Sequence, residues 1–349
     1  MPIEIFVGTG GVGKTSVAAA TALKTALAGH KCLVLTIDPA TRLRTALEMD
    51  LGGTEQKVPL HDAEENGELW AAIVNIRASL DRAVLREAKP EEAQSILEHP
   101  LYQVLITSLA GMQELIAIER IHQAVAEGYH SIFIDTAPSR HALEFLDKPE
   151  FFAHLVSFPI VKLVGRTYQW WLRSRLARLS RMTFELYTRV EEILGATLVH
   201  QVLDFFSIFR KIAEGYADRA EQTLSMLRDP HTTSFTIVTT PFKARRDAEY
   251  FLTELRKRKF SVSAMVVNRI WPRFPATVPP DSHPMLQELL AWYGNVSSAH
   301  HRIWNDVSRQ FSSQIPKLIP LTELPRDVDG VSALYELVRG MEKPATNTV

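Results

Sequence analysis

The chain has 349 residues, of which 46% are hydrophobic, and its formal net charge is -1. This length suffices for one large domain or two smaller ones, each with a buried core. Because 39 lysine and arginine residues balance 40 acidic residues, no overall charge excess drives the protein onto nucleic acid or an anionic membrane. An electrostatic partner therefore requires a local patch, and we expect no nucleic-acid partner.

A single cysteine, Cys32, lies in the apolar run Cys32–Thr36. A disulfide framework and a cysteine-based zinc site are therefore excluded within one chain, and we expect a buried, inert thiol. The first residues lack the basic and small-residue pattern of a signal peptide, and no uninterrupted stretch of about 18 apolar residues occurs. We expect the protein to be soluble and cytoplasmic.

The first predicted element is the strand Ile3–Val7, which leads into the glycine-rich loop Gly8–Thr15. The loop has the P-loop spacing G-x-x-x-x-G-K-T, and residues Lys14–Leu27 predict a helix after it. Its glycines let backbone N–H groups face an anion, and the positive end of the helix points at the same place. The loop predicts a triphosphate site in which Lys14 neutralises the phosphates and the Thr15 hydroxyl binds Mg²⁺. The residues expected to bind the nucleotide are Gly10, Gly11, Val12, Gly13, Lys14, Thr15 and Ser16.

The next predicted strand, Cys32–Thr36, completes a βαβ unit, so its direction should be parallel to the first. It is followed by Asp38. In sheets of this kind, ligands bind at the carboxyl ends of the strands. Asp38 is therefore expected beside the P-loop.

A second carboxylate follows a later strand. The sequence predicts a strand at Glu68–Asn75, helices from Ala78 to Gly128 with a break at Pro100, and a strand at Ser131–Ile134 that ends in Asp135. This is the pattern of a Walker B strand, whose carboxylate supports Mg²⁺ through water next to the P-loop hydroxyl. Capping of a following helix is the alternative for this residue.

The middle of the chain, from Phe151 to about Arg228, shows helical periodicity and no strong strand signal. The fold class predicted is α/β, a mostly parallel P-loop NTPase sheet flanked by helices, with a helical subdomain inserted after the Walker B strand. Residues 1–150 and 229–341 form its core, 151–228 the helical insert and 342–349 a flexible tail. The later elements expected are strands at Ser234–Thr239, Ser261–Asn268 and Lys317–Pro320, helices at Arg245–Lys259, Ala299–Ser312 and Val328–Gly340, and a proline-rich connection at Pro272–Pro284.

Three motifs together resemble the arsenite-pump ATPase (ArsA) family, which includes the ATPases that target tail-anchored membrane proteins. Gly8–Thr15 is similar to the family's G-K-G-G-V-G-K-T at all but one position, and Thr36–Ala40 resembles its switch I, S-T-D-P-A-x-N. Asp135–His141 resembles D-T-A-P-T-G-H, which distinguishes the family from the MinD and ParA proteins of the same deviant Walker A class. The resemblance covers nearly the whole chain.

The resemblance implies an ATP-hydrolysing homodimer in which Lys14 and Asp38 are catalytic. Asp38 orients or activates the attacking water, and Asp135 supports Mg²⁺. Asn268 recognises adenine through its side-chain amide, whose donor and acceptor suit a base edge. From the residue alone, a turn at the strand end is the alternative for Asn268. Pro320 stands in the place of the family's adenine-side loop.

Thr9 stands where the family has its signature lysine, which reaches the partner's nucleotide in a closed homodimer. A neutral hydroxyl cannot stabilise the charge on the transferred phosphoryl group, so hydrolysis is expected to be slow unless another cation replaces that lysine. Arg42 and Arg140 are the candidates, because they stand in the two switch motifs in place of Asn and Gly. A solvated or salt-bridged arginine is the alternative at both positions.

The metal-binding cysteines of the family have no counterpart here, because Cys32 lies in a core strand. Arsenite transport therefore loses its chemistry. His300 and His301 do not replace those cysteines, since adjacent helix residues point in different directions. We expect both histidines to face solvent.

The helical insert bears on the partners of the protein. Most of its many aromatic side chains are expected in a packed core, and a minority in a groove for a hydrophobic client. Its segment Lys162–Arg189 has seven basic residues and one acidic residue, a pattern suited to peripheral contact with an anionic membrane or to an acidic partner; a solvated face is an equal alternative.

The sequence therefore predicts an ATP- and Mg²⁺-dependent ATPase that binds a hydrophobic or membrane-protein client. The alternatives are a slow or non-hydrolysing ATP switch, a MinD/ParA-like positioning protein at a membrane surface, and an arsenite or anion pump motor.

Overall fold

The computed structural model describes residues 2–38, 42–52, 54–61, 67–99, 102–103, 113–137, 219, 221–273 and 283–342. Two compact units divide the chain: Met1–Val74, Gln123–Leu143 and Leu224–Val349 form the first, and Asn75–His122 and Glu144–Thr223 form the second. Arg140, the tail residues 343–349 and nearly all of the helical insert lie outside the described residues. What the sequence indicates for them stays a prediction.

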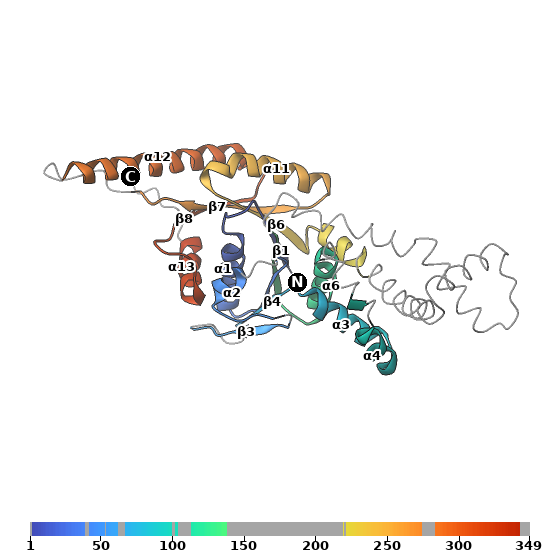
Figure 1. The fold of residues 1–349 in the computed structure, drawn as a ribbon. Helices are drawn as coiled ribbons and strands as arrows, with labels where there is room; N and C mark the ends of the chain where they lie inside the picture. Colours follow the sequence, from blue (N-terminus) through green and yellow to red (C-terminus); the bar gives the residue numbers. More distant parts are fainter. Residues whose placement is uncertain are drawn as a thin grey trace, which may run out of the picture. The chain divides into compact units, whose positions relative to one another are not determined.

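The first unit is built on a sheet of eight strands in the described part of the chain, in the order β3-β4-β2-β5-β1-β6-β7-β8 (Figure 1). Neighbouring strands are parallel, except that β3 pairs antiparallel with β4 at one edge. The predicted α/β fold with a mostly parallel sheet is therefore confirmed. The strands are β1 (Ile3–Val7), β2 (Lys31–Thr36), β3 (Gln56–Val58), β4 (Glu68–Ile73), β5 (Ser131–Asp135), β6 (Thr233–Thr239), β7 (Val262–Ile270) and β8 (Lys317–Thr322).

Helices cover both faces of this sheet (Figure 1). On one face α1, α2 and α13 contact one another, and on the other α11 contacts α12 and the strands β6 and β7. The helices of the first unit are α1 (Lys14–Leu27), α2 (Arg42–Leu47), the 3-10 helix η2 (Pro241–Lys243), α11 (Ala244–Lys257), α12 (Pro284–Phe311) and α13 (Gly330–Glu342).

Helix α1 packs closely on the sheet because its buried face is rich in alanine. Val17, Leu23 and five alanines of this helix are fully buried. They form one hydrophobic cluster with Phe6, Val34 and Phe133, which come from β1, β2 and β5. Small side chains let helix and sheet approach closely, and the packing fixes the start of α1 against the ends of these three strands.

The described part of the second unit consists of α3 (Ile76–Glu87), α4 (Pro90–Glu98), most of α6 (Gln113–Ala126) and a few residues near Arg219. Asn75 directly precedes α3, and its side chain accepts a hydrogen bond from the Ala78 N–H at 3.0 Å. This is a standard N-terminal cap. The sequence assigned residues 75–122 to the ATPase core, whereas contacts group them with residues 144–223.

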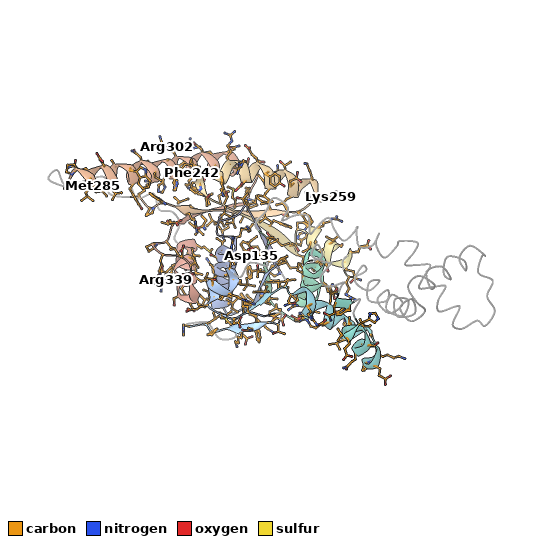
Figure 2. The ribbon with its side chains drawn as sticks, in the orientation of Figure 1. Asp135, Phe242, Lys259, Met285, Arg302 and Arg339 are labelled. Carbon is orange, nitrogen blue, oxygen red and sulfur yellow. The ribbon has the colours of Figure 1, made fainter. Side chains whose placement is uncertain are left out.

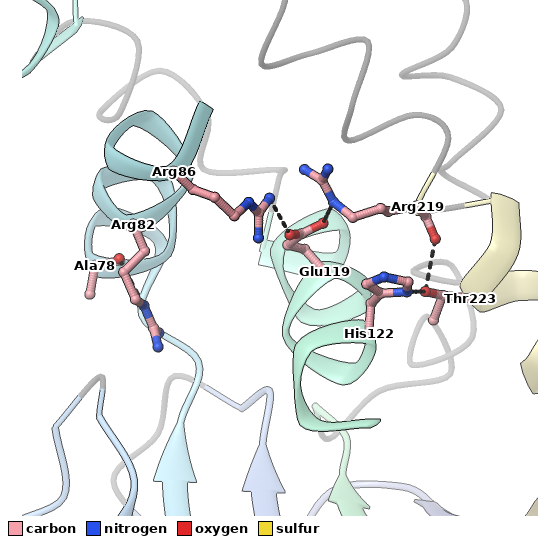
Figure 3. A network of polar contacts seen from close by, with 7 residues as sticks. All are labelled: Ala78, Arg82, Arg86, Glu119, His122, Arg219 and Thr223. Carbon is pink, nitrogen blue, oxygen red and sulfur yellow. Dashed lines mark hydrogen bonds and ion pairs between the residues drawn. The ribbon is translucent and has the colours of Figure 1, made fainter. Parts of the chain in front are cut away.

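A buried carboxylate explains this grouping (Figure 3). The side chain of Glu119 on α6 is 1% exposed and accepts hydrogen bonds from Arg86 Nη2 at 3.0 Å and from Arg219 Nε at 2.8 Å. Nearby, the Thr223 hydroxyl lies 3.3 Å from His122 Nδ1 and donates to the Arg219 carbonyl. Since the two arginines are far apart in sequence, Glu119 joins α3, α6 and the residues around 219 into one unit.

Helix α12 begins earlier than the sequence indicates. It starts at Pro284, whereas we expected a proline-rich connection up to that residue and a helix from Ala299. His283 Nδ1 accepts a hydrogen bond from the Met285 N–H at 3.3 Å and so caps the helix. Pro284 takes the first helical position, where a missing N–H costs nothing. The proline therefore marks the start of the helix.

The expectation that His300 faces solvent is wrong. His300 is 6% exposed, and its Nδ1 accepts a hydrogen bond from the Trp271 N–H at 3.2 Å. Its ring packs edge-on against Phe242 of η2, which lies beside α12 (Figure 2). This face of α12 covers the chain that leaves β7, so a histidine there is enclosed. Cys32 is fully buried, as expected.

Within the described ranges, no helix combines the length and the apolar character that a membrane crossing requires.

Replacing Glu119 by alanine should destabilise the second unit. The substitution leaves two arginines without their shared carboxylate, and because both arginines are only partly buried the loss should cost about 2 kcal/mol. Denaturant unfolding and hydrogen exchange in α3 and α6 measure this cost. Glu98→Ala is the matched control, because Glu98 accepts a hydrogen bond from Gln94 on the exposed surface. It should change stability by less than about 0.5 kcal/mol, and equal losses in the two variants would contradict the role of Glu119.

Candidate functional site

The P-loop joins β1 to α1 at the carboxyl edge of the sheet. Strand β1 lies between β5 and β6, and β2 follows β5, so the residues after these parallel strands meet at the same edge. Gly13 has a φ of 87° directly before α1, a conformation that glycine adopts without strain. A Cβ on Gly8 would lie 2.2 Å from the Val238 carbonyl oxygen, so this glycine lets the loop pass close to β6.

The two predicted magnesium residues are in direct contact. The Thr15 hydroxyl donates a hydrogen bond to Asp135 Oδ2 at 2.7 Å, and the Thr36 hydroxyl donates to the same oxygen at 2.9 Å. Asp135 lies in the interior of the first unit at the end of β5 (Figure 2). Thr36, at the end of β2, enters the sequence analysis only as part of the switch I motif. A hydroxyl two residues before Asp38, at the same edge of the sheet, could have indicated a hydrogen-bond donor for the carboxylates there.

One oxygen of the Asp135 carboxyl lacks a hydrogen-bond donor among the described residues. Burial raises its pKa to about 6, although the hydrogen bond from Thr15 and the charge of Lys14 act in the opposite direction. Its other oxygen, Oδ1, is buried and has no hydrogen-bond partner among the described residues. This oxygen and the Thr15 hydroxyl are the hard ligands that Mg²⁺ prefers, so the residues fit a magnesium ion.

The described residues include no cluster of three or more His, Cys, Asp or Glu side chains able to hold a metal ion by themselves. A magnesium ion beside Asp135 would need further ligands, which phosphate and water would supply. Magnesium usually binds at nucleotide sites in this way.

Lys14 and Asp38 lie near Asp135, at the same edge of the sheet. Lys14 is buried, and its Nζ donates a hydrogen bond to the Thr9 carbonyl oxygen at 3.3 Å. Burial lowers the pKa of Lys14, while the charges of Asp135 and Asp38 act to raise it. The ammonium is thus within electrostatic range of both carboxylates. Asp38 is buried, and its N–H donates to the Thr36 hydroxyl oxygen at 3.2 Å.

Thr9, the residue in place of the signature lysine, is held by a distant acid. Its hydroxyl donates to Asp247 Oδ2 at 3.0 Å, and the Thr239 hydroxyl donates to the same oxygen at 2.9 Å. Lys243 Nζ donates to the Gly10 carbonyl oxygen at 3.2 Å. The sequence does not predict the bonds of Thr9 to Asp247 and of Lys243 to Gly10, because no local pattern connects residues that lie more than 200 positions apart.

Asn268 and Pro320 occupy neighbouring strands on the other side of the loop. The Asn268 side-chain amide is buried and donates to the Val12 carbonyl oxygen at 3.0 Å. Pro320 pairs with Val267 in the register of β7 and β8. The amide therefore stabilises the P-loop through this bond. Its contact with adenine stays a prediction.

Of the two candidate replacement cations, Arg42 begins α2 and is exposed. It is close enough to the P-loop for its charge to lower the pKa of Lys14, although burial of Lys14 is the larger cause. Arg140 lies outside the described residues. The structure thus brings together Lys14, Thr15, Asp38 and Asp135 as the sequence indicates.

The sequence model of the anion-transporting ATPase family matches residues 1–341. The chain belongs to this family. Among its relatives, a putative arsenical pump-driving ATPase of Chlorobaculum tepidum is 27% identical over 273 residues, which cover 77% of this chain and 61% of the relative. ATPase GET3C of Arabidopsis thaliana is 28% identical over 281 residues, 76% of this chain and 66% of the relative. ATPase GET3 of Podospora anserina is 26% identical over 271 residues, 76% of this chain and 72% of the relative.

Membership of the anion-transporting ATPase family confirms the resemblance stated from the motifs. The chain spans less than two thirds of the length of the first two of these relatives. The family match therefore establishes the family and the fold of this chain. Its activity, substrates and partners are proposed below.

Gly13→Ala should disturb the P-loop more than Gly11→Ala. Both glycines have positive φ, so both substitutions cause similar backbone strain. A Cβ at residue 13 would lie 2.3 Å from Asn268 Nδ2, whereas one at residue 11 meets nothing within 4 Å. We expect Gly13→Ala to lower the free energy of unfolding of the nucleotide-free protein by about 2 kcal/mol more than its control. Adding Asn268→Ala should remove the difference, and a difference that persists would contradict the contact.

Asp135→Asn should stabilise the nucleotide-free protein at neutral pH. The pKa of this carboxyl is raised from 3.8 to about 6, so its ionisation reduces stability as pH rises through that interval, by about 3 kcal/mol in total. An asparagine keeps an oxygen that accepts a hydrogen bond from Thr15. The stability gain over the wild type should therefore grow between pH 4 and about 6 and then level off. Denaturant unfolding at each pH measures it, and a gain independent of pH would contradict the raised pKa.

Proposed function

We propose that this chain is a Mg²⁺-dependent ATPase whose nucleotide state controls the binding of a hydrophobic or membrane-associated client. The observation that carries the proposal is the buried contact between the Thr15 hydroxyl and the Asp135 carboxylate beside the P-loop lysine. Membership of an ATPase family supports ATP as the nucleotide. The proposed nucleotide contacts are Gly10, Gly11, Val12, Gly13, Lys14, Thr15, Ser16, Asn268 and Pro320.

Thr15 and Asp135 would hold Mg²⁺, Asp135 through water. When bound, the ion neutralises charge on the β- and γ-phosphates. Lys14 adds a second positive charge at the same phosphates. Asp135 Oδ1 supports this assignment, because it is buried and has no hydrogen-bond partner within the described part of the chain, and such an oxygen gains most from a cation or an ordered water.

Asp38 is the residue that we assign to the attacking water. It is buried at the end of β2, within electrostatic range of Lys14. In the proposed reaction the water oxygen bonds to the γ-phosphorus while the bond to the β–γ bridging oxygen breaks, and ADP leaves. One water proton passes to Asp38 and then to solvent, and the other stays on the inorganic phosphate.

The resemblance to ATPases that target tail-anchored membrane proteins favours a homodimer whose helical insert binds the client. Relatives named ATPase GET3C and ATPase GET3 support the ATPase part of this proposal. A positioning protein at a membrane surface, attached through Lys162–Arg189, is the alternative that uses the same nucleotide chemistry. A cytoplasmic location stays a prediction.

Two other candidates have specific observations that bear on them. A slow ATP switch is favoured by Thr9, whose neutral side chain is bonded to Asp247 within its own chain. An arsenite pump motor is suggested by the name of one relative. Against it, the sole cysteine of the chain is fully buried, and burial raises the pKa of the Cys32 thiol to about 12. A thiol of this kind does not supply the thiolate that binds a soft metalloid.

Asp38→Asn should lower the Mg-ATPase kcat about 100-fold or more and leave ATP affinity nearly unchanged, because the amide no longer accepts a proton from the water. Lys14→Ala should instead abolish ATP binding. Steady-state turnover and calorimetric ATP binding separate the two effects. Wild-type turnover in Asp38→Asn would sink the assignment of Asp38, and absence of ATP binding by the wild type would sink the proposed function.

The assembly and the client need separate measurements. The mass of the protein with and without ATP tests the homodimer. Co-purification with single-span membrane proteins supports the targeting function, whereas ATP-dependent binding to anionic liposomes without a client supports the positioning alternative.

A further inference from the structure

Two lysine ammonium groups donate to neighbouring carbonyls of the P-loop. Lys14 Nζ bonds to the Thr9 oxygen at 3.3 Å, and Lys243 Nζ bonds to the Gly10 oxygen at 3.2 Å. Lys14 belongs to the P-loop motif, whereas Lys243 comes from η2, more than 200 residues later in the chain. A second cation therefore lies at the loop whose backbone N–H groups are suited to phosphate.

The segment that carries Lys243 also fixes Thr9. Asp247 follows four residues after Lys243 at the start of α11, is 2% exposed, and accepts the Thr9 hydroxyl. Side chains four residues apart lie on the same side of a helix. The junction of η2 and α11 thus presents the Asp247 carboxylate to Thr9 and the Lys243 ammonium to Gly10.

We propose that Lys243 is the phosphate-facing cation that stands in for the missing signature lysine, and that it acts on the nucleotide bound to its own chain. The inference rests on the proposed ATPase function. The bond from Lys243 to a neutral carbonyl is exposed to solvent and contributes little to stability. A charge-assisted bond to a phosphate oxygen is stronger, and the flexible lysine stem can move its ammonium by a few ångströms without a change in the backbone. A bound triphosphate therefore draws Lys243 away from the Gly10 carbonyl.

The same geometry predicts the behaviour of a lysine at position 9. In Thr9→Lys the new ammonium meets the buried Asp247 carboxylate of its own chain, because the Thr9 hydroxyl already bonds to that carboxylate. An ion pair within the chain holds the lysine away from the nucleotide of a partner. Thr9→Lys should therefore give no large gain in turnover.

Arg245 provides a matched control on the same segment. It lies two residues after Lys243, but its side chain is 73% exposed and pairs with Glu249 at 3.1 Å. Neutralising Arg245, near the start of α11, removes the same charge from the neighbouring turn without removing a contact to the P-loop. Arg42 is the competing candidate cation, since its charge reaches Lys14.

The test compares the full chain with Lys243→Met, Lys243→Arg, Arg245→Met, Arg42→Met and Thr9→Lys. Calorimetry with Mg²⁺ measures the affinity for a non-hydrolysable ATP analogue and for ADP, and steady-state assays measure kcat. We expect Lys243→Met to lower kcat about 100-fold and to weaken binding of the ATP analogue about tenfold more than binding of ADP. Lys243→Arg should restore most of both, and Arg245→Met should stay within twofold of the wild type.

Four results would overturn the inference while the proposed function stands: normal turnover in Lys243→Met, equal weakening of ATP-analogue and ADP binding, the loss appearing in Arg42→Met instead, or a large gain in Thr9→Lys. Equal weakening would indicate a structural role for the lysine stem. A wild type that binds neither nucleotide would overturn the proposed function and this inference with it.

Discussion

The site depends on one carboxylate that is buried at the end of a central strand. Asp135 is enclosed, and the hydroxyls of Thr15 and Thr36 both donate to one of its oxygens. Two hydroxyl donors do not replace the water that a carboxylate loses on burial, which is why its pKa is raised to about 6. The nucleotide-free fold therefore holds an electrostatic cost that a cation beside Oδ1 would relieve. Ligand binding and stability are coupled through this group.

The sequence predicts the structure correctly where a local pattern of residues is compatible with only one backbone conformation. The P-loop helix has the predicted bounds, Lys14–Leu27, because glycines, lysine and an alanine-rich run all specify the same turn into a helix. The carboxylates Asp38 and Asp135 follow predicted strands, and parallel pairing then brings them to one edge. The start of α12 is not predicted correctly, because prolines before Ala299 indicate a connection, whereas proline is also compatible with the first turn of a helix.

Other features are invisible to local patterns because they arise only when distant segments pack. The enclosure of His300 depends on the chain after β7, and the grouping of α3 with α6 depends on the ion pairs of Glu119. The antiparallel edge strand β3 is three residues long, too short for a periodic signal. In each case the missing information is a tertiary contact that overrides a weak local preference.

The first loop residues illustrate why family membership does not determine how each member works. Comparison with the family motif shows that Thr9 replaces a lysine, and the loss of this positive charge would indicate slow ATP hydrolysis. In the fold, the hydroxyl of Thr9 is the donor that a buried Asp247 requires, and a lysine four residues before this acid lies at the next loop carbonyl. A buried acid without a donor costs more free energy than an exposed lysine contributes. Asp247 on α11 therefore constrains which residue can occupy position 9. The positive charge near the phosphates includes lysines that approach the P-loop from distant parts of the sequence, and not only those within the motif.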